Sequence, residues 1–267
     1  MKLFSVLAVG LMLAGPVSAQ DFDKGVAAYN AGDYATALQE WRPLAKQGDT
    51  SAQSNLGLMY SYGRGVLQDY AEAAKWYRLA AEQGNATAQY NLGLMYEDGR
   101  GVPQDSAEAV KLFRLSAEQG NATAQYNLGT MYEKGNGVPQ DYAAAVKLYR
   151  FAAEQGYANA QFNLGVMYAK GRGALQDYAE AVKWYRLAAE QGYASAQSNL
   201  GLMYSYGRGV LQDAVLAHMW YNIGGSNGQA LGSENRGKVE KRMTREQIAE
   251  AQALARRCMA SNYQDCD

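Results

Sequence analysis

Apolar positions between residues 49 and 228 recur at spacings of three, four and seven, which is the period of one helical face. Within residues 85–120, Leu92 and Met95 lie on one such face, and Leu112 and Phe113 lie on a second. Polar residues fill the positions between them. The pattern therefore predicts two amphipathic helices in this stretch, each with a buried side.

Residues typical of helix ends mark where both predicted helices begin and end. Asn85 is placed to cap the first helix, and Asp105 to begin the second. Gly99 and Gly101 end the first helix and form the loop, and Gly120 closes the second helix. An Asp-x-x-Glu arrangement that permits a capping box occurs at Asp69/Glu72, Asp105/Glu108 and Asp177/Glu180.

The whole pattern repeats every 36 residues. Residues 51–69 recur unchanged as residues 195–213, four periods later. Gly93 lies in mid-helix, where glycine costs about 1 kcal/mol relative to alanine, so its repetition predicts a close approach of two helices. One hairpin cannot bury its apolar face alone, whereas stacked hairpins share a continuous core. The motif Asn-Leu-Gly-x-Met-Tyr begins at Asn55, Asn91, Asn127, Asn163 and Asn199.

The two ends of this array depart from the repeat, as capping units should. Residues 20–48 predict a hairpin with a short turn at Gly32 and a second helix kinked by Pro43. Residues 49–228 form the repeats, and residues 229–267 form C-terminal capping helices and a tail. In the latter, Thr244-x-x-Gln247 predicts a capping box. We count seven helical pairs, five with the full signature.

Residues 1–19 have the features of an export signal. Lys2 precedes an apolar stretch at residues 3–14, and Val17-Ser18-Ala19 is a small-residue cleavage motif. We expect a cut after Ala19 and a periplasmic or secreted mature chain; a buried N-terminal helix is the alternative. No later stretch is apolar enough for a membrane helix, so no integral membrane segment is expected after signal removal. With 25 Lys+Arg against 26 Asp+Glu, no basic excess favours nucleic acid.

The repeat consensus resembles the Sel1-like repeat family. It runs A-x-x-Q-x-N-L-G-x-M-Y-x-x-G-x-G-V and continues D-Y-x-x-A-x-x-W-Y-x-x-A-A-E-Q-G over residues 49–228, and the hairpin before it resembles a tetratricopeptide repeat. The resemblance implies an all-α fold, a right-handed superhelical solenoid of tandem hairpins whose first helices line a concave groove. It also implies a role as an adaptor between proteins. Some secreted relatives bind or hydrolyse β-lactams, but they carry a cysteine pair in each repeat, which is absent here.

By analogy with tetratricopeptide geometry, three positions of each first helix face this groove. An aromatic strip with apolar neighbours and two glutamates suits a peptide partner, because aromatic side chains bury much area with little loss of rotamer entropy. Packing between repeats is the alternative explanation of the rings. The predicted groove residues are Ser54, Leu58, Tyr90, Leu94, Glu97, Tyr126, Thr130, Glu133, Phe162, Val166, Ser198 and Leu202, with Ser61, Ala169 and Ser205 completing the third row.

Residues that could carry other chemistry have structural explanations. His218 aligns with core valines and predicts a buried histidine, without a second ligand for a metal. Cys258 and Cys266 are the only cysteines; in an exported chain they predict a disulfide, with free thiols or a cross-chain bridge as alternatives. Arginine recurs in the loops, at Arg64, Arg100, Arg172 and Arg208, and Asn136 replaces it once. We predict that these arginines tether their loops; a row of anion-binding sites is the alternative.

These observations favour a scaffold of the bacterial envelope that binds a protein or peptide in its groove, without metal or cofactor. No nucleophile motif or cluster of converging polar groups supports an enzyme. A β-lactamase-like envelope hydrolase and a secreted host-interaction factor are the alternatives.

Overall fold

The computed structural model describes residues 21–266, and within this range it contains 14 helices and no strand. Twelve of them form six hairpins, in which we call the first helix A and the second B. The A helices are α1 (Phe22–Asn30), α3 (Thr50–Tyr62), α5 (Ala86–Asp98), α7 (Ala122–Lys134), α9 (Ala158–Lys170) and α11 (Ala194–Tyr206). The B helices are α2 (Tyr34–Lys46), α4 (Tyr70–Glu82), α6 (Ser106–Glu118), α8 (Tyr142–Glu154), α10 (Tyr178–Glu190) and α12 (Ala214–Ser226); α13 (Ala230–Glu240) and α14 (Arg245–Ala260) follow.

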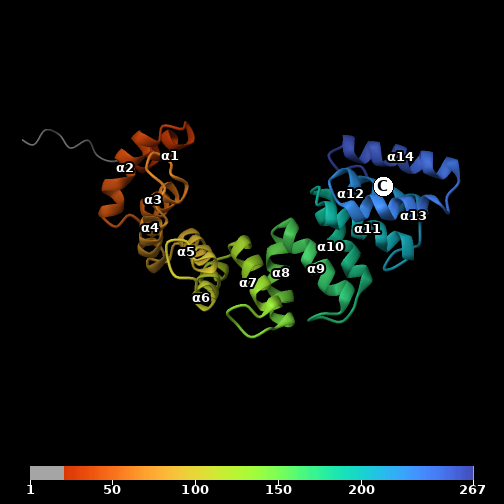
Figure 1. Ribbon diagram of the computed structural model, residues 1–267, viewed down its shortest axis with the longest axis horizontal. Coiled ribbons are helices and arrows are strands. Elements are labelled where there is room, and N and C mark those ends of the chain that lie inside the picture. The colour runs from red at the N-terminus through yellow and green to blue at the C-terminus, as the bar shows by residue number, and fades with distance from the viewer. Residues whose placement is uncertain (1–20, 267) are drawn as a thin grey trace, which may run out of the picture.

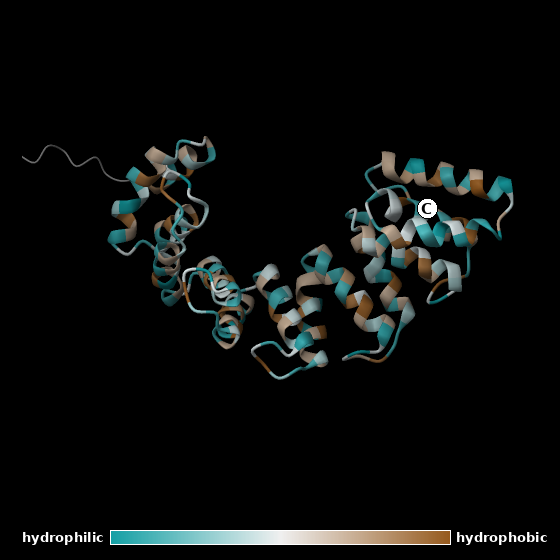
Figure 2. Ribbon diagram, viewed as in Figure 1, coloured by the Kyte–Doolittle hydropathy of each residue, from teal (hydrophilic) through white to brown (hydrophobic). Residues whose placement is uncertain are grey.

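Stacking of the hairpins gives an open arch (Figure 1). Each of the first five B helices packs on its own A helix and on the A helix of the next hairpin, and α12 packs on α11, α13 and α14. The N-terminal hairpin and the C-terminal helices occupy the two ends of the arch, and α7 to α9 lie at its middle (Figure 1). Apolar and polar residues are mixed along every helix, as amphipathic helices sharing one extended core require (Figure 2). The predicted all-α superhelical solenoid is confirmed.

The predicted helix ends are present. Asn85 accepts a hydrogen bond from the amide of Ala88 at 2.8 Å, and Asp105 accepts from the amide of Glu108 at 3.0 Å. Gly99 ends α5 in the left-handed region at φ +70°, and Gly120 follows α6 at φ +88°. The reciprocal half of the Asp-x-x-Glu box is not formed, because carboxylates such as that of Glu108 accept from a lysine one turn later. The capping box at Thr244 and Gln247 is complete.

The mid-helix glycines allow the two helices of a hairpin to touch. A Cβ atom on Gly93 would lie 2.7 Å from the Phe113 ring, and one on Gly201 would lie 2.8 Å from the Tyr221 ring. The N-terminal hairpin uses the same device, since a Cβ on Gly25 would lie 2.3 Å from the Trp41 ring. The close approach that the repeated glycine predicts is therefore real, and its partner is an aromatic ring of helix B.

A buried glutamine links each hairpin to the next. Gln125 donates to the carbonyl of Ala117 at 3.1 Å and accepts from the side chain of Gln155 at 2.8 Å. Ala117 belongs to the last turn of α6, where backbone carbonyls have no partner within the helix. The Gln of A-x-x-Q thus caps the preceding helix, and the Gln of E-Q-G donates a hydrogen bond that holds this capping side chain in place. The same bonds recur at Gln53, Gln89, Gln161 and Gln197, with Asn227 replacing the last donor.

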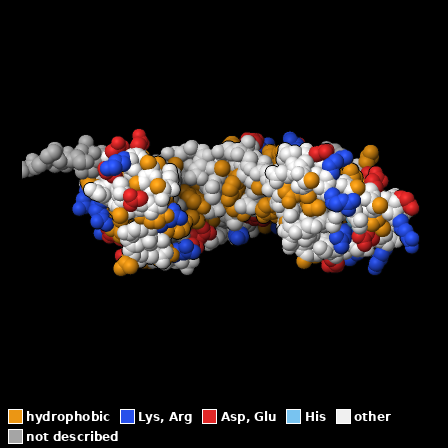
Figure 3. All heavy atoms as spheres, turned by 90° about the horizontal axis from the view of Figure 1, so that it is seen from above, with side chains coloured by type: hydrophobic (Ala, Val, Ile, Leu, Met, Phe, Trp, Pro, Cys, Tyr) orange, Lys and Arg blue, Asp and Glu red, His pale blue; other side chains and the backbone are white. Residues whose placement is uncertain are grey.

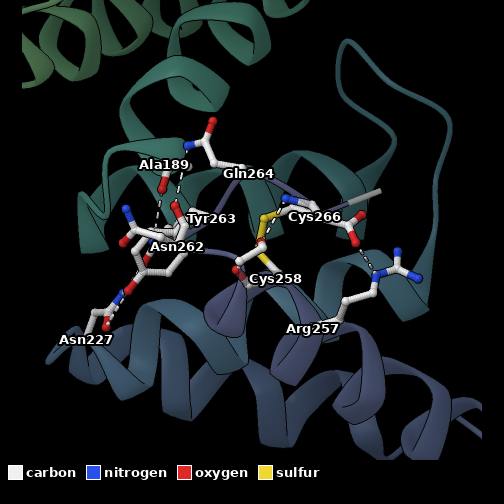
Figure 4. Close-up of a disulfide and its surroundings, with 11 residues drawn as sticks. Ala189, Asn227, Arg257, Cys258, Asn262, Tyr263, Gln264 and Cys266 are labelled. Atoms are coloured by element: carbon white, nitrogen blue, oxygen red, sulfur yellow. Dashed lines mark hydrogen bonds and ion pairs between the residues drawn. A yellow bond between two sulfur atoms is a disulfide. The ribbon is translucent and has the colours of Figure 1, made fainter.

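The C-terminal end differs from the expected seventh pair. The helices α13 and α14 each pack on α12 rather than chiefly on one another. Cys258 and Cys266 are joined by a disulfide, and the tail between them places the Tyr263 hydroxyl 2.9 Å from the amide nitrogen of Asn227 (Figure 4). The tail thereby returns to the end of α12. At the other end of the arch, α2 continues through Pro43 to Lys46.

The predicted export signal at residues 1–19, with its cut after Ala19, lies outside the described residues. Within the described range, none of the helices combines the length and the apolar character needed to cross a bilayer.

Candidate functional site

The aromatic strip of the predicted groove is half-buried. One face of each ring packs on the aromatic residue of its own B helix. The ring centroids of Tyr90 and Phe113 are 5.7 Å apart, those of Tyr126 and Tyr149 5.8 Å, and those of Phe162 and Tyr185 6.0 Å. These rings are therefore both packing residues and part of the surface.

Two further tyrosines extend this strip, and the sequence analysis did not identify them. Tyr157 and Tyr193 occupy the N-cap positions of α9 and α11, where the preceding repeats have asparagine, and neither makes a side-chain cap bond. Tyr157 packs on Tyr126 with ring centroids 5.3 Å apart, and Tyr193 packs on Phe162 at 5.1 Å. An N-cap contributes about 1 kcal/mol, so these positions exchange a cap for an aromatic contact. In the sequence, the replacement of Asn by Tyr at this N-cap position is the signal that could have identified these two residues.

The remaining predicted groove residues divide into two groups. Ser54 and Ser198 are each only 7% exposed and offer almost no contact surface, contrary to the expectation that they face a groove. Ser205 is buried as well. The others are half-buried at the surface: Leu58, Leu94, Thr130, Val166, Leu202, Glu97, Glu133, Ser61 and Ala169.

Hollows open between successive A helices at equivalent places in the array. One, of about 140 Å³, lies between α3 and α5, and the other, of about 500 Å³, lies between α9 and α11. Leu94 lines the first; Phe162, Val166 and Leu202 line the second. With Ser61 and Ala169, six of the predicted groove residues thus border a real concavity. The residues that line both at equivalent positions are Ser61/Ala169, Tyr62/Lys170, Tyr70/Tyr178, Tyr77/Tyr185, Asn91/Asn199, Leu94/Leu202, Met95/Met203 and Arg100/Arg208.

Buried tyrosine hydroxyls provide polar groups beneath this surface. The Tyr149 hydroxyl donates to a carboxylate oxygen of Glu133 at 2.7 Å and lies 3.2 Å from Oγ1 of Thr130. Burial raises the pKa of Tyr149, and burial likewise raises the pKa of Tyr185 to about 12. Asn199 of the next A helix partly opposes the shift in the pKa of Tyr185 through a side-chain hydrogen bond. These hydroxyls are therefore neutral hydrogen-bonding groups at physiological pH.

Charged side chains are sparse on the inner side of the arch. Figure 3, which is seen from above the open side, shows hydrophobic side chains in its middle, whereas Lys, Arg, Asp and Glu gather toward the two ends and the margins. Glu97 and Glu133 are the predicted acidic groups of the groove. Such a surface suits a partner that contributes mainly apolar contacts.

The loop arginines pack on tyrosines of the preceding hairpin. The guanidinium carbon of Arg172 lies 5.8 Å from the ring centroid of Tyr142, and that of Arg208 lies 5.6 Å from Tyr178. Arg100 contacts Tyr70 similarly and forms an ion pair with Asp98 at 3.1 Å. In sequence, Asn136 replaces the loop arginine where Ser106 replaces the tyrosine. This paired replacement supports the tether, whose recurring partner is a tyrosine ring, with a carboxylate added at Arg100.

His218 is fully buried in α12, and its Nε2 lies 2.8 Å from a carboxylate oxygen of Glu240 in α13. The pair joins the last repeat to the C-terminal helices. In the described part of the chain, His, Cys, Asp and Glu side chains do not gather in groups of three or more that could hold a metal ion.

The Sel1 repeat family matches five consecutive segments of the chain, at residues 50–85, 86–121, 122–157, 158–193 and 194–229. These segments cover more than half of the sequence, so the chain belongs to the Sel1 repeat family. Proteins of this family generally mediate protein–protein interactions, and the fold is typically non-catalytic.

One solved structure agrees with this assignment, and a second is similar in sequence. A Sel1 repeat protein from Oxalobacter formigenes is 37% identical, with a TM-score of 0.74 over 78% of this chain and 86% of that chain. A protective antigen of uropathogenic Escherichia coli strains, which displays an SLR fold, is 30% identical, with a TM-score of 0.49 over 91% of this chain and 69% of that chain. Comparison with curated proteins gave no match.

Proposed function

We propose that this chain is an exported scaffold of the bacterial envelope that holds an extended segment of a partner protein along its A helices. The observation that carries the proposal is the surface formed by Tyr90, Tyr126 and Phe162 with the hollows beside them. Aromatic groups of this kind, half-exposed on a rigid helical array, are the usual anchors of a protein-binding surface.

The polar groups of the hollows suit a peptide backbone. An extended chain carries one N–H donor and one C=O acceptor per residue, and these need partners when the segment is bound. Asn91 and Asn199 line the two hollows at equivalent positions and offer amide donors and acceptors. Asparagine recurs at this position in every repeat, which suits a ligand that is itself regular along its length; the residues are Asn55, Asn91, Asn127, Asn163 and Asn199.

The exported location is part of the proposal. It rests on the signal-like residues 1–19 and on the cysteine pair near the C-terminus, since disulfides persist in oxidising compartments. A secreted host-interaction factor would use the same surface and differ only in where the chain is delivered.

An envelope hydrolase of the β-lactamase-like type is the less favoured function. His218 is the only histidine, and its fully buried ring faces Glu240 instead of a hollow between A helices. A chain without the Cys pair in each repeat also lacks the feature that marks the β-lactam-binding relatives. Hydrolysis of a reporter β-lactam by the purified chain, lost in His218→Ala, would reverse this preference.

The direct test is affinity capture from an envelope extract with the chain from Gln20 as bait. A groove variant with Tyr90, Tyr126 and Phe162 changed to Ala is run beside it, with helicity checked by circular dichroism. The matched control changes Leu115, Phe151 and Leu187 to Ala, because these are apolar residues of comparable size that are 38–47% exposed on B helices.

We expect a partner that the parent chain and the control retain and the groove variant loses. Because the three rings also pack on B helices, a second variant, Leu94→Glu with Val166→Glu, adds charge to the surface without removing a ring. Equal capture by the parent and both groove variants would place the binding surface elsewhere. Capture of no partner would contradict the scaffold function.

A further inference from the structure

We propose that the groove selects a partner segment carrying a lysine or arginine side chain, which is held by the carboxylate of Glu97. This inference rests on the proposed function. It specifies in addition that the ligand carries a positive charge and that Glu97 binds this charge. It follows from a difference between two glutamates at the same position of adjacent repeats.

Glu97 and Glu133 are one period apart, and both are half-buried on the A-helix surface. The carboxylate of Glu133 accepts the hydroxyl of Tyr149 at 2.7 Å. The carboxylate of Glu97 has no hydrogen bond and no ion pair to any residue in the range that the structure describes. A carboxylate that is partly withdrawn from water needs a donor or a cation to offset its lost hydration.

The difference arises from a single side chain on helix B. Phe113 and Tyr149 occupy equivalent positions, each against the backbone of its own A helix. A Cβ on Gly93 of α5 would lie 2.7 Å from the Phe113 ring, and a Cβ on Gly129 of α7 would lie 2.9 Å from the Tyr149 ring. Phenylalanine lacks the hydroxyl that tyrosine donates. The repeat containing Glu97 therefore retains the acceptor and has lost its internal donor.

The groups around Glu97 suit a long cationic side chain. Tyr90 packs on Phe113. Burial is the main cause that raises the pKa of Tyr90, and the nearby charge of Glu97 adds a smaller effect in the same direction. Leu94 lies one turn before Glu97 on the same helix. The alkyl stem of a lysine or arginine can rest on the apolar surface of Leu94 and Tyr90 while its charged end reaches the carboxylate. The Tyr90 ring can add a cation–π contact.

The neighbouring charges leave the Glu97 carboxylate without a paired cation. Burial raises the pKa of Glu97, Asp98 raises it further, and Lys134 lowers it by a smaller effect. Asp98 is itself paired with Arg100, and Lys134 forms no ion pair with Glu97. A bound ammonium or guanidinium group would oppose the effect of burial and complete the hydrogen bonding of the carboxylate.

The test selects binders from a library of random peptides displayed on phage, with the chain from Gln20 as the target and the Tyr90/Tyr126/Phe162→Ala variant for counter-selection. Peptides that bind only the parent chain are synthesised. Each is paired with a copy in which its shared Lys or Arg is changed to Met. Affinities are measured by isothermal titration calorimetry.

Three single variants separate the charge from the fold. Glu97→Gln removes the charge but keeps the shape. Phe113→Tyr supplies the hydroxyl that Tyr149 supplies to Glu133, so it should engage Glu97 internally. Glu133→Gln is the matched control, because that carboxylate already has its donor.

We expect the selected peptides to share a basic residue whose change to Met weakens binding about tenfold or more, as loss of a charged hydrogen bond should. Glu97→Gln and Phe113→Tyr should weaken the basic peptide similarly and leave the Met copy unchanged, whereas Glu133→Gln should weaken the basic peptide much less, because the Glu133 carboxylate already accepts the Tyr149 hydroxyl. The affinity should also fall as the pH decreases through the raised pKa of Glu97, because the protonated group carries no charge.

Selected peptides that need the groove but share no basic residue would overturn the charge selection and leave the proposed function intact. Equal effects of Glu97→Gln and Glu133→Gln would also overturn it. Selection of no groove-dependent peptide would contradict both proposals.

Discussion

Residues 51–69 and 195–213 have the same sequence but do not have the same surroundings. Both form an A helix that ends in a left-handed glycine, at φ +64° for Gly63 and φ +63° for Gly207. Yet Ser61 is half-buried whereas Ser205 is buried, and Tyr60 is half-buried whereas Tyr204 is buried. The difference lies in what packs against each copy: α2, α4 and α5 contact the first, and α10, α12 and α13 contact the second. A repeat therefore determines its own hairpin, and its neighbours determine its surface.

The repeats between these two copies differ from them in groove chemistry. Where the outer copies have Ser54 and Ser198, both buried, the intervening repeats carry Tyr90, Tyr126 and Phe162 at the surface. The backbone of the array is regular, so this contrast arises from side chains alone. The aromatic part of the surface proposed for binding thus lies in the middle of the arch, whereas the outer copies contribute residues to the hollows beside it.

The largest expected effect comes from an identical substitution in the two identical stretches. A Cβ on Gly209 would lie 2.3 Å from the backbone of Tyr178, whereas one on Gly65 would lie 2.7 Å from the side-chain Cβ of Tyr34. Neither a backbone atom nor a Cβ can move aside by a rotamer change, and the approach at Gly209 is the shorter one. Gly209→Ala should therefore cost about 2–5 kcal/mol, from left-handed strain plus overpacking, and Gly65→Ala less. Urea unfolding followed by circular dichroism measures both.

Gly84→Ala is the reference for this pair. Gly84 has φ +90°, and a Cβ there would meet no atom within 4 Å, so only the backbone cost of about 1–2 kcal/mol applies. If all three variants lost the same stability, the contacts of the loop glycines would be irrelevant.

Loss of the disulfide should increase the difference in local stability between the two identical stretches. Changing Cys258 and Cys266 to Ala should cost about 2–3 kcal/mol, because the bond closes a short loop. The tail that brings Tyr263 to Asn227 should loosen, so residues 195–213 should exchange amide hydrogen faster while residues 51–69 remain unchanged. Hydrogen exchange with mass spectrometry detects this, provided that each peptide extends beyond the identical stretch. Equal acceleration in both would indicate global rather than terminal loosening.

A central repeat can be made more like its neighbours by filling a hollow. Leu148 occupies the position that Trp76 and Trp184 hold in outer repeats, and it borders a hollow of about 470 Å³ together with Leu128 and Phe151. Leu148→Trp should therefore stabilise the chain by about 0.5–2 kcal/mol, as cavity filling commonly does. A higher thermal midpoint would support this expectation, and a lower one would show that the hollow cannot accept the indole ring.

The smallest expected change in stability concerns the N-cap positions where tyrosine replaces asparagine. Tyr157→Asn should gain about 1 kcal/mol from a restored cap and lose about 0.5–1.5 kcal/mol from the contact with Tyr126, so stability should change little. Binding in the groove should weaken, because an aromatic group leaves the surface. In the control, Asn121→Ala loses a cap without any compensating ring, and should cost about 0.5–2 kcal/mol. A large loss in Tyr157→Asn would mean that the ring pair is structural.

Features within one hairpin could be predicted from the sequence, and features between hairpins could not. The caps at Asn85 and Asp105, the left-handed Gly99 and the close approach at Gly93 each depend on a few neighbouring residues. The ring beneath each loop arginine belongs to the preceding hairpin, and Gln125 donates to Ala117 of the preceding hairpin while the C-cap of its own B helix, Gln155, donates to it. The recurring glutamine on an otherwise apolar face was a signal that pattern analysis did not use.

The candidate site shows the same division. The sequence located the aromatic strip on the correct helices, because the helical period orders residues around one helix. It did not show that Ser54 and Ser198 are covered, nor that Tyr157 and Tyr193 extend the strip, because burial and ring contacts depend on which hairpin lies alongside.

The sequence by itself determined the helix type, the ends of most helices, the period of 36 residues and the all-α solenoid, since these follow from local hydrogen bonding, backbone conformation and the need to bury one face of each helix. Only the tertiary structure decided which polar groups find partners. Tyr149 satisfies Glu133, whereas Phe113 leaves Glu97 without a donor, and that distinction exists only because a B-helix ring reaches across to the A-helix surface.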